Sequence, residues 1–187
     1  MNKQNESAAL AQYLTRFQPA ASQVAHWPKA KLRVTAALTE NLPPREFTLS
    51  VRAIMFRDRN VMVITDPNSI HLTPGGRCEP GESIDETLER ELLEETGYKV
   101  RTRQLLGVMC FEHLTPRPDV CPPHLFPLFF QPVYHVEAGD CDESRRERDG
   151  FEISAEFRPL ELARQWAQDP VTSLFLDRAL ALRSLAS

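Results

Sequence analysis

A group of acidic side chains near the middle of the chain has a spacing that suits metal-assisted chemistry. Glu94 and Glu95 lie three and four residues after Glu91, so on a helix all three fall within an arc of about 100°. Carboxylates this close repel one another, and partial burial raises the cost unless a cation lies between them. Carboxylate oxygens with no nearby thiolate or imidazole favour Mg²⁺ or Mn²⁺, and Mg²⁺ readily takes phosphate oxygens as further ligands. The spacing therefore predicts a Mg²⁺ or Mn²⁺ site for a substrate that carries phosphate.

A solvated acidic helix face is the alternative, because most glutamate-rich helices are no more than that. The residues in front of the acids favour the metal site. Gly75 and Gly76 follow the apolar segment from Ile70 to Leu72, so a strand is expected to end there in a turn. Such a turn can direct a backbone carbonyl at the carboxylates.

The helix that must position the acids has clear start and stop signals. Ser83 and Glu86 have the spacing of a capping box, in which each side chain bonds the backbone N–H of the other residue. Gly97 is a residue that tolerates the left-handed conformation common just after a helix. Apolar residues recur between these signals at helical spacing and form one stripe for burial: Ile84, Leu88 and Leu92. The sequence predicts a helix from Ser83 to about Thr96 whose acids border the buried stripe.

The stretch from Gly76 to Tyr98 resembles the Nudix box, whose pattern is Gx5Ex7REUxEExGU with U a bulky apolar residue. The fixed positions are filled by Gly76, Glu82, Arg90, Glu91, Glu94, Glu95 and Gly97, with Leu92 and Tyr98 at the U positions. The resemblance implies an α/β fold, more strictly α+β, in which a mixed β-sheet lies within an α/β/α sandwich. It also implies hydrolysis of a nucleoside diphosphate linked to another group, and it speaks for the reaction class rather than for one substrate.

The resemblance implies roles for the residues of the box. The metal ligands expected on this basis are Glu91, Glu94, Glu95 and the backbone carbonyl of Gly75. Glu94 is also a candidate for the base that takes the proton of the attacking water. Arg90 and Glu82 have the charges to pair and to hold the loop on the helix, so Arg90 is expected to support catalysis.

Residues outside the box are expected to complete the site. The segment from Glu152 to Leu162 resembles the Nudix region in which an acid precedes an aromatic strand end, so Glu152 is the first candidate for a further catalytic carboxylate and Glu156 the second. Arg77 is a candidate phosphate contact. Arg146 lies in the charged segment GDCDESRRERDG, where it could clamp phosphate, although a charged run is more often only solvated.

Length and charge limit the class of protein. A chain of 187 residues with 42% hydrophobic residues suits one globular domain, and its net charge of −4 argues against a general nucleic-acid binder. No run is long and apolar enough to cross a bilayer, and the first residues do not resemble a secretory signal. We expect a cytoplasmic protein that acts on a small nucleoside diphosphate derivative, without membrane or nucleic-acid partners.

The order of elements suggests an extension followed by a catalytic domain. Residues 1–46 are expected to form a helical extension and residues 47–187 the Nudix domain. An amphipathic helix from about Ser7 to Phe17 is expected to pack on the domain or on a second subunit, which would give a homodimer. Within the extension, Leu32 to Leu38 suits either a short helix or a strand. The expected strands of the domain are Phe47–Phe56, Val61–Thr65, Gln104–Phe111, Leu128–Val136 and Phe151–Phe157. Pro132 suggests an edge or bulge position for its strand.

Two other readings of the sequence remain open. The chain could keep the Nudix fold and bind a nucleotide without cutting it, as a sensing module. Alternatively, two Cys-x-x-His pairs, Cys110/His113 and Cys121/His124, could hold zinc, although residues three apart on a strand point to opposite faces. The proline-rich connection from Pro116 to Pro123 could shape substrate choice or be an ordinary surface loop.

Overall fold

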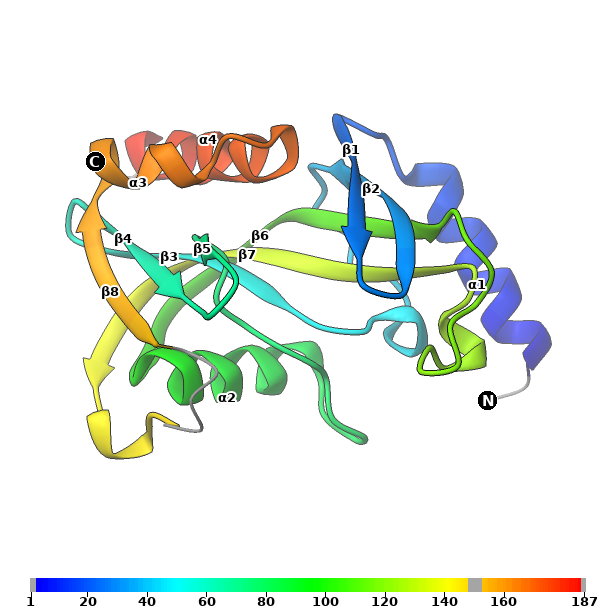
Figure 1. The fold of residues 1–187 in the computed structure, drawn as a ribbon, viewed down its shortest axis with the longest axis horizontal. Coiled ribbons are helices and arrows are strands. Elements are labelled where there is room, and N and C mark those ends of the chain that lie inside the picture. The colour runs from blue at the N-terminus through cyan, green and yellow to red at the C-terminus, as the bar shows by residue number, and fades with distance from the viewer. Residues whose placement is uncertain (1–2, 148–152, 186–187) are drawn as a thin grey trace.

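The computed structural model describes residues 3–147 and 153–185 and arranges them as one mixed β-sheet with helices on both faces (Figure 1). The strands are β1 Ala21–Trp27, β2 Ala30–Ala37, β3 Arg52–Arg57, β4 Asn60–Thr65, β5 Ile70–His71, β6 Tyr98–His113, β7 Leu128–Cys141 and β8 Ser154–Pro159. The helices are α1 Lys3–Arg16, α2 Ile84–Thr96, α3 Leu160–Ala163 and α4 Pro170–Leu185. Because α2 covers one face and α3 and α4 cover the other, the predicted α/β/α sandwich is confirmed.

The sheet is mixed because one of its central pairs is parallel. Its strand order is β1-β2-β6-β7-β3-β4-β5, with β8 paired to β4 beside this path. The β3 and β7 strands run parallel, whereas the other paired strands are antiparallel. The loop that leads into α2 bonds the start of β3, because the Val51 N–H donates to the Gly76 carbonyl at 3.0 Å and the Ala53 N–H to the Pro74 carbonyl at 2.9 Å, so the sheet holds the glycines in place.

Each face of the sheet has its own apolar core. Leu88 and Leu92 of α2 are fully buried on one face against Met55 and Met62. On the other face, α4 buries Phe175 in a larger cluster. Burial of each leucine side chain contributes about 1.5–3 kcal/mol relative to exposure. The apolar stripe of α2 is therefore anchored firmly enough to fix the direction of its acids.

The N-terminal segment is only partly helical, so the expectation of a helical extension over residues 1–46 was wrong in this respect. After α1, the chain forms the β1–β2 hairpin, and β2 pairs with β6 from Leu32↔His113 to Ala37↔Val108. The alternation of buried and exposed side chains in β2 fits a strand whose two faces differ. The hairpin is thus part of the sheet, while a domain boundary at residue 47 stays a prediction.

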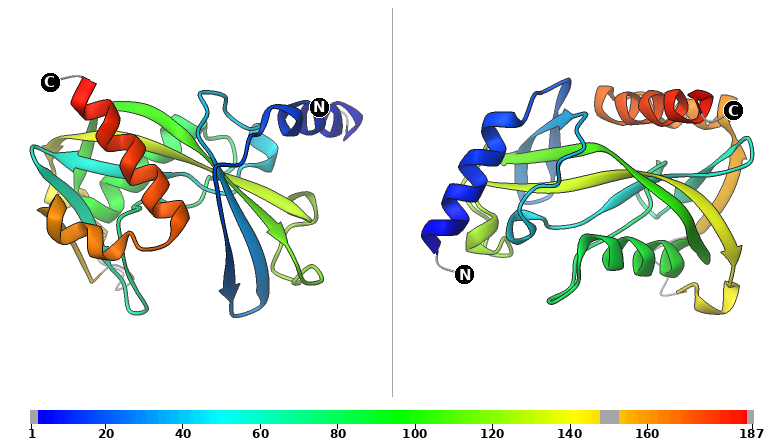
Figure 2. Two further views of the ribbon diagram at one scale, coloured as in Figure 1. Left: turned by 90° about the horizontal axis from the view of Figure 1, so that it is seen from above. Right: turned by 180° about the vertical axis from the view of Figure 1, so that it is seen from behind.

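Helix α1 packs on the same molecule, which was one of the two placements expected for it. Tyr13 lies edge-on to Phe130, with ring centroids 5.1 Å apart, and Phe17 contacts the same ring at 6.2 Å. Phe130 is fully buried beneath them. The aromatic contacts therefore close the end of the sheet that carries the hairpin (Figure 2).

Two strand predictions need correction. Pro132 does not lie on an edge, because β7 has β6 on one side and β3 on the other. The β3 pairing begins one residue later, at Arg52↔Val133, and the register of β6 against β7 shifts between Leu105 and Gly107, so the bulge expected as the alternative lies next to Pro132. The strand expected from Phe47 begins at Arg52, because Arg45–Phe47 form a 3-10 turn.

Among the described residues, no helix has the length and apolar character needed to cross a membrane.

His71 gives the fold a pH-dependent contribution to stability. Burial, together with the positive charge of Arg52, lowers the pKa of His71 to about 4, although Asp66 lies 3.6 Å away. Its pKa is thus depressed on folding, so this contribution is present above the unfolded pKa of about 6.5 and is lost as the pH falls towards 4. Because the side chain is 31% exposed, we expect a loss on the order of 1 kcal/mol between pH 7 and pH 5.

Urea denaturation of the wild type and of His71→Gln at these two pH values measures the contribution. The wild type is expected to lose more unfolding free energy than the variant on acidification. Equal losses in the two proteins would contradict the assignment to His71.

Candidate active site

Helix α2 begins and ends where its sequence signals lie. Ser83 caps its first turn, with its hydroxyl accepting from the Glu86 N–H at 3.2 Å while the Glu86 carboxylate accepts from the Ser83 N–H at 2.8 Å. Gly97 ends the helix at φ 77°, in the left-handed region. This register presents the three box glutamates towards the preceding loop.

The glycine loop contacts two of those glutamates directly. The Gly75 N–H donates to Glu95 Oε2 at 2.7 Å. The α-carbon of Gly76 faces Glu91, and a Cβ there would lie 2.2 Å from Glu91 Oε2. Gly75 itself has φ +125°, and a Cβ on it would lie 2.4 Å from the carbonyl oxygen of Val51. The two glycines are therefore needed for different reasons, close approach to a carboxylate at residue 76 and backbone conformation at residue 75.

Arg90 lies at the centre of the acidic group. Its Nε donates to Glu82 Oε1 at 2.7 Å, which is the ion pair expected from the sequence. One terminal nitrogen donates to Glu91 Oε1 at 3.0 Å and to Glu94 Oε2 at 2.9 Å. The other donates to the Arg77 carbonyl at 3.0 Å. A single guanidinium thus joins the loop to the helix and partly neutralises three carboxylates.

The charges shift the pKa values in opposite directions. Hydrogen bonds from Arg90 lower the pKa of Glu82 to about 2, so this carboxylate stays ionised. Burial raises the pKa of Glu91 above its ordinary value, although Arg90 acts against the shift. The Glu91 side chain is only 14% exposed. Its negative charge is therefore less well solvated than that of Glu94, whose side chain is 30% exposed.

The donor set suits a hard divalent cation, although the side chains do not converge as a finished cage. In the described part of the chain, no three His, Cys, Asp or Glu side chains meet in an arrangement that could hold a metal ion. Glu95 faces the Gly75 N–H, while Glu91 and Glu94 face Arg90. The oxygens offered are carboxylates and one carbonyl, which Mg²⁺ and Mn²⁺ prefer. The poorly solvated Glu91 charge gives a cation a favourable place next to Gly76.

The other predicted site residues lie at varying distances from this group. Arg77 is exposed, and its carbonyl contacts Arg90. Arg146 Nε donates to the Glu95 carbonyl at 3.2 Å, so it meets the last turn of α2 rather than an open anion site. Glu156 on β8 pairs with Arg158. Glu152 lies outside the described residues.

Arg52 was not expected from the sequence. It lies on β3, and its guanidinium donates to the carbonyl of Gly75. Its charge also opposes the rise that burial causes in the pKa of Glu91, and it adds to the lowering of the pKa of His71. The sequence feature that could have indicated its role is a single arginine in the apolar run VRAIMF. A charged side chain in a strand with neighbours on both sides, as β3 has, needs a partner.

The four residues of the alternative zinc site do not gather. Cys110 packs with Phe130 under α1, and burial raises the pKa of its thiol to about 12. Cys121 instead lies 3.7 Å from His113 Nε2 and packs against the core on the α4 face. The two cysteines thus contact different apolar clusters.

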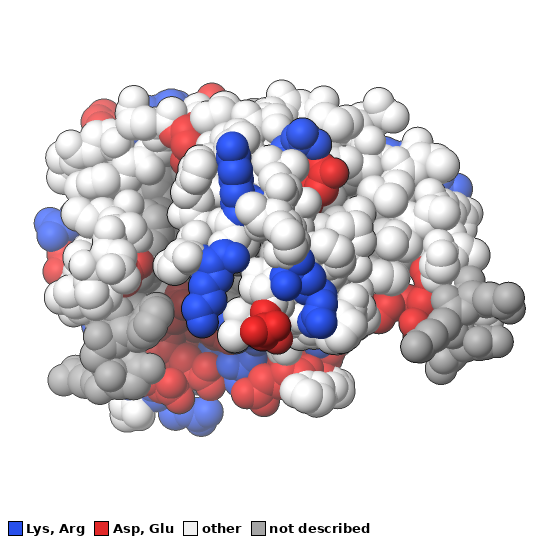
Figure 3. All heavy atoms as spheres, turned by 45° about the vertical axis from the view of Figure 1, so that its right-hand side comes forward, with Lys and Arg blue, Asp and Glu red and all other residues white. Residues whose placement is uncertain are grey.

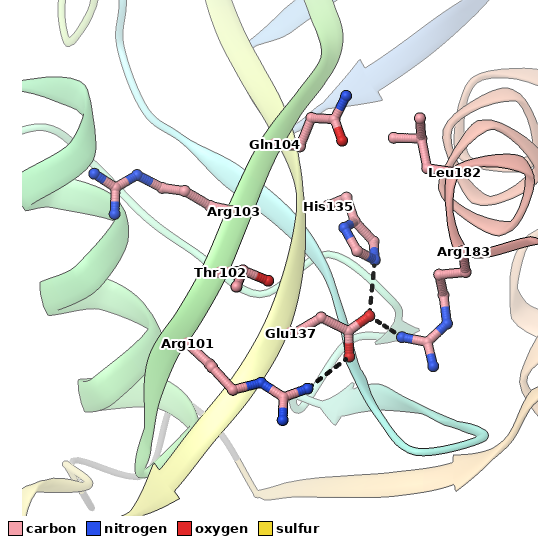
Figure 4. Close-up of a pocket in the computed structure, with 8 residues that line it drawn as sticks. All are labelled: Arg101, Thr102, Arg103, Gln104, His135, Glu137, Leu182 and Arg183. Atoms are coloured by element: carbon pink, nitrogen blue, oxygen red, sulfur yellow. Dashed lines mark hydrogen bonds and ion pairs between the residues drawn. The ribbon is translucent and has the colours of Figure 1, made fainter. Parts of the chain in front are cut away.

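A polar cavity lies beside α4, and charged side chains that line it pair with one another. It has a volume of about 450 Å³ and centres on Glu137 of β7 (Figure 4). The Glu137 carboxylate lies 3.1 Å from His135 Nε2 and 3.6 Å from Arg101, and it also pairs with Arg183 of α4. Figure 4 places these side chains around one carboxylate, so the cluster joins α4 to the sheet.

Comparison with known proteins places this geometry in one family. The model of the NUDIX domain matches residues 46–175. A stretch of the chain is 33% identical over 76 residues to an ADP-ribose pyrophosphatase of Methanocaldococcus jannaschii, covering 38% of this chain and 45% of that protein. Another is 54% identical over 35 residues to a putative 8-oxo-dGTP diphosphatase of Bacillus subtilis, covering 19% of this chain and 24% of that one. The chain therefore spans less than half the length of these relatives.

Solved structures agree at the level of the fold. A pyrophosphohydrolase of Bacillus subtilis has a TM-score of 0.59 at 18% identity, covering 79% of this chain and 89% of that one. A NUDIX hydrolase of Nitrosomonas europaea has a TM-score of 0.55 at 20% identity, covering 72% and 88%.

Proposed function

Since this chain belongs to the NUDIX family, we propose that it is a metal-dependent hydrolase that cleaves the diphosphate linkage of a nucleoside diphosphate derivative. The observation that carries the proposal is the group formed by Glu91, Glu94 and Glu95 against the glycine loop, with Arg90 between loop and helix. Names of partial relatives, an ADP-ribose pyrophosphatase and an 8-oxo-dGTP diphosphatase, support a phosphoric anhydride as the bond that is cut.

The metal ion proposed for this site is Mg²⁺ or Mn²⁺, held by Glu91, Glu94, Glu95 and the Gly75 carbonyl. When bound, such an ion offsets the charge of the diphosphate and lowers the pKa of a water molecule for attack at neutral pH. The Gly75 carbonyl has two lone pairs, so its bond to the Arg52 guanidinium leaves one for a further partner. The bonds of Arg90 to Glu82 and to the Arg77 carbonyl hold the loop in place.

The proton of the attacking water goes to a carboxylate, either Glu94 or Glu152. Arg77 is exposed beside the loop and is the proposed contact for a substrate phosphate. Arg146 uses its Nε to bond the Glu95 carbonyl at the last turn of α2, which leaves its terminal nitrogens as a second candidate contact for phosphate. A cytoplasmic location and a homodimer both stay predictions.

A panel of nucleoside diphosphate derivatives tests the proposal by release of phosphate or of a nucleoside monophosphate. We expect hydrolysis with Mg²⁺ or Mn²⁺ and at least about a 100-fold loss with EDTA, because the metal supplies charge that no side chain replaces. Activity that is independent of the metal would contradict the proposed mechanism. No hydrolysis across the panel, with nucleotide binding retained, would favour a sensing module instead.

A further inference from the structure

A cleft of about 580 Å³ opens beside the glycine loop, between the β1–β2 turn and the proline-rich segment from Pro118 to Leu125. Its lining combines the hairpin turn, the loop of the box and the end of β6. Part of it lies before residue 46, where the match to the family model begins. Residues of the box thus share the cleft with residues of the β1–β2 hairpin, which lies outside the match to the family model.

One part of the cleft lining is a cluster of aromatic rings. Trp27 is 45% exposed and lines the cleft. Its ring lies 5.7 Å from Phe111 and 6.2 Å from Phe129, which stack on each other at 4.9 Å with their planes 4° apart. Both phenylalanines are buried. The indole is therefore supported by a rigid pair and leaves part of its surface open for a planar ligand.

The lining also holds a polar group without a partner. His113 lines the cleft, and among the described residues its Nδ1 is buried with no hydrogen bond. Its other ring nitrogen lies 3.7 Å from Cys121 Sγ. Because Nδ1 is buried, a ligand in the cleft does not reach it as the side chain stands, so His113 contributes to the lining but adds no polar contact to the argument.

Two cations line the cleft, and one of them lies next to the acidic group. Arg77 and Lys29 line it and are exposed, and neither has an ion-pair partner within residues 3–147 and 153–185. The Arg77 carbonyl contacts Arg90, so the rim of the cleft joins the acidic group. Figure 3 shows basic side chains above a lower band of acidic ones on the side of the molecule that carries the hairpin. A ligand that fits has a planar ring at one end and an anionic group at the other.

We propose that this cleft binds the nucleobase of the substrate, stacked on Trp27, while Arg77 and Lys29 meet the adjoining phosphate. The proposal rests on the proposed hydrolase function, because it directs the diphosphate towards the acids of α2. Because the proposed contact with the base is mainly stacking, we expect purines to bind more tightly than pyrimidines, and adenine and guanine to bind with similar affinity. Diphosphates without a base are expected to be poor substrates.

Binding is tested with AMP, which has a base and a phosphate but no anhydride to cleave. The chain has two tryptophans, and Trp166 lines a different hollow beside β8, so Trp166→Phe leaves Trp27 as the only indole. We expect AMP to quench the fluorescence of Trp166→Phe, with GMP similar, UMP weaker and ribose 5-phosphate without effect. No quenching by AMP, or equal quenching by ribose 5-phosphate, would overturn the subsite.

Kinetics then separate this subsite from the reaction itself. Trp27→Ala is expected to raise KM for a purine nucleoside diphosphate derivative by about tenfold or more with little change in kcat, because a lost base–aromatic stack weakens binding. Trp27→Phe should recover much of the affinity, and Trp166→Phe should resemble the wild type. An unchanged KM in Trp27→Ala would overturn the subsite and leave the hydrolase intact. Quenching by AMP in a protein that hydrolyses nothing would support the subsite and overturn only the proposed reaction.

Discussion

Replacing Glu94 or Glu95 with glutamine is expected to lower kcat by at least about 100-fold, because a neutral amide holds a divalent cation poorly and cannot take a proton. The side chain keeps its length, so the fold should survive. Glu95 shares a hydrogen bond with the Gly75 N–H, which an amide oxygen can also accept. Hydrolysis measured over a range of Mg²⁺ concentrations should show both a lower maximum and a weaker response to the metal.

Glu89→Gln is the matched control on the same helix. Its carboxylate is 56% exposed and pairs with Arg103 at 2.8 Å, away from the glycine loop. Loss of a surface ion pair of this kind costs roughly 0–1 kcal/mol and leaves the acidic group untouched. We expect near-normal activity and a near-normal melting temperature. Full activity in both Glu94→Gln and Glu95→Gln would refute the assigned role of the box acids.

Alanine at the two adjacent glycines is expected to damage the protein in two different ways. In Gly75→Ala the new Cβ meets the Val51 carbonyl at 2.4 Å, and φ is +125°, so the backbone must shift and stability should fall by several kcal/mol. In Gly76→Ala the new Cβ meets the Glu91 carboxylate at 2.2 Å. Because a flexible side chain can move aside, that variant should stay folded and lose about tenfold or more in activity through the displaced carboxylate.

Thermal melts and activity of the purified variants distinguish the two effects. Gly75→Ala should melt well below the wild type or fail to accumulate as folded protein. Gly76→Ala should melt within a few degrees of the wild type, although its activity at the same protein concentration should be clearly lower. Normal activity in Gly76→Ala would contradict the prediction that hydrolysis depends on the position of the Glu91 carboxylate against the loop.

Local signals explain which parts of the fold were predictable. The bounds of α2 follow from Ser83, Glu86 and Gly97, since caps and turns depend on residues only a few positions apart. Strands at β3 and β4 were likewise predicted from two apolar runs, Phe47–Phe56 and Val61–Thr65, although the first strand begins only at Arg52. The β1–β2 hairpin could not be assigned because Leu32 to Leu38 suits either a helix or a strand, and only its pairing with β6 decides between them.

Distant contacts explain which parts of the site were not predictable. Arg52 is 23 residues from Gly75 in sequence, and their contact depends on how β3 lies beside the loop. Arg146 is 51 residues from Glu95, and the return of β7 towards the end of α2 directs it to a backbone carbonyl. The partners of these two arginines could not be predicted, because a positive charge suits phosphate or solvent equally and the sequence does not show which groups lie opposite a side chain.

The sequence by itself determined the family, the acidic helix and its glycine loop, because the box is a short pattern whose residues act within a few turns of one another. Only the tertiary structure decided what surrounds that pattern. It placed Arg90 between three carboxylates, Arg52 on the Gly75 carbonyl and Trp27 on a buried aromatic pair. Arg52 and Trp27 lie on strands that are remote in the chain from the groups they contact, and pairing across a sheet is settled by the packing of the whole molecule.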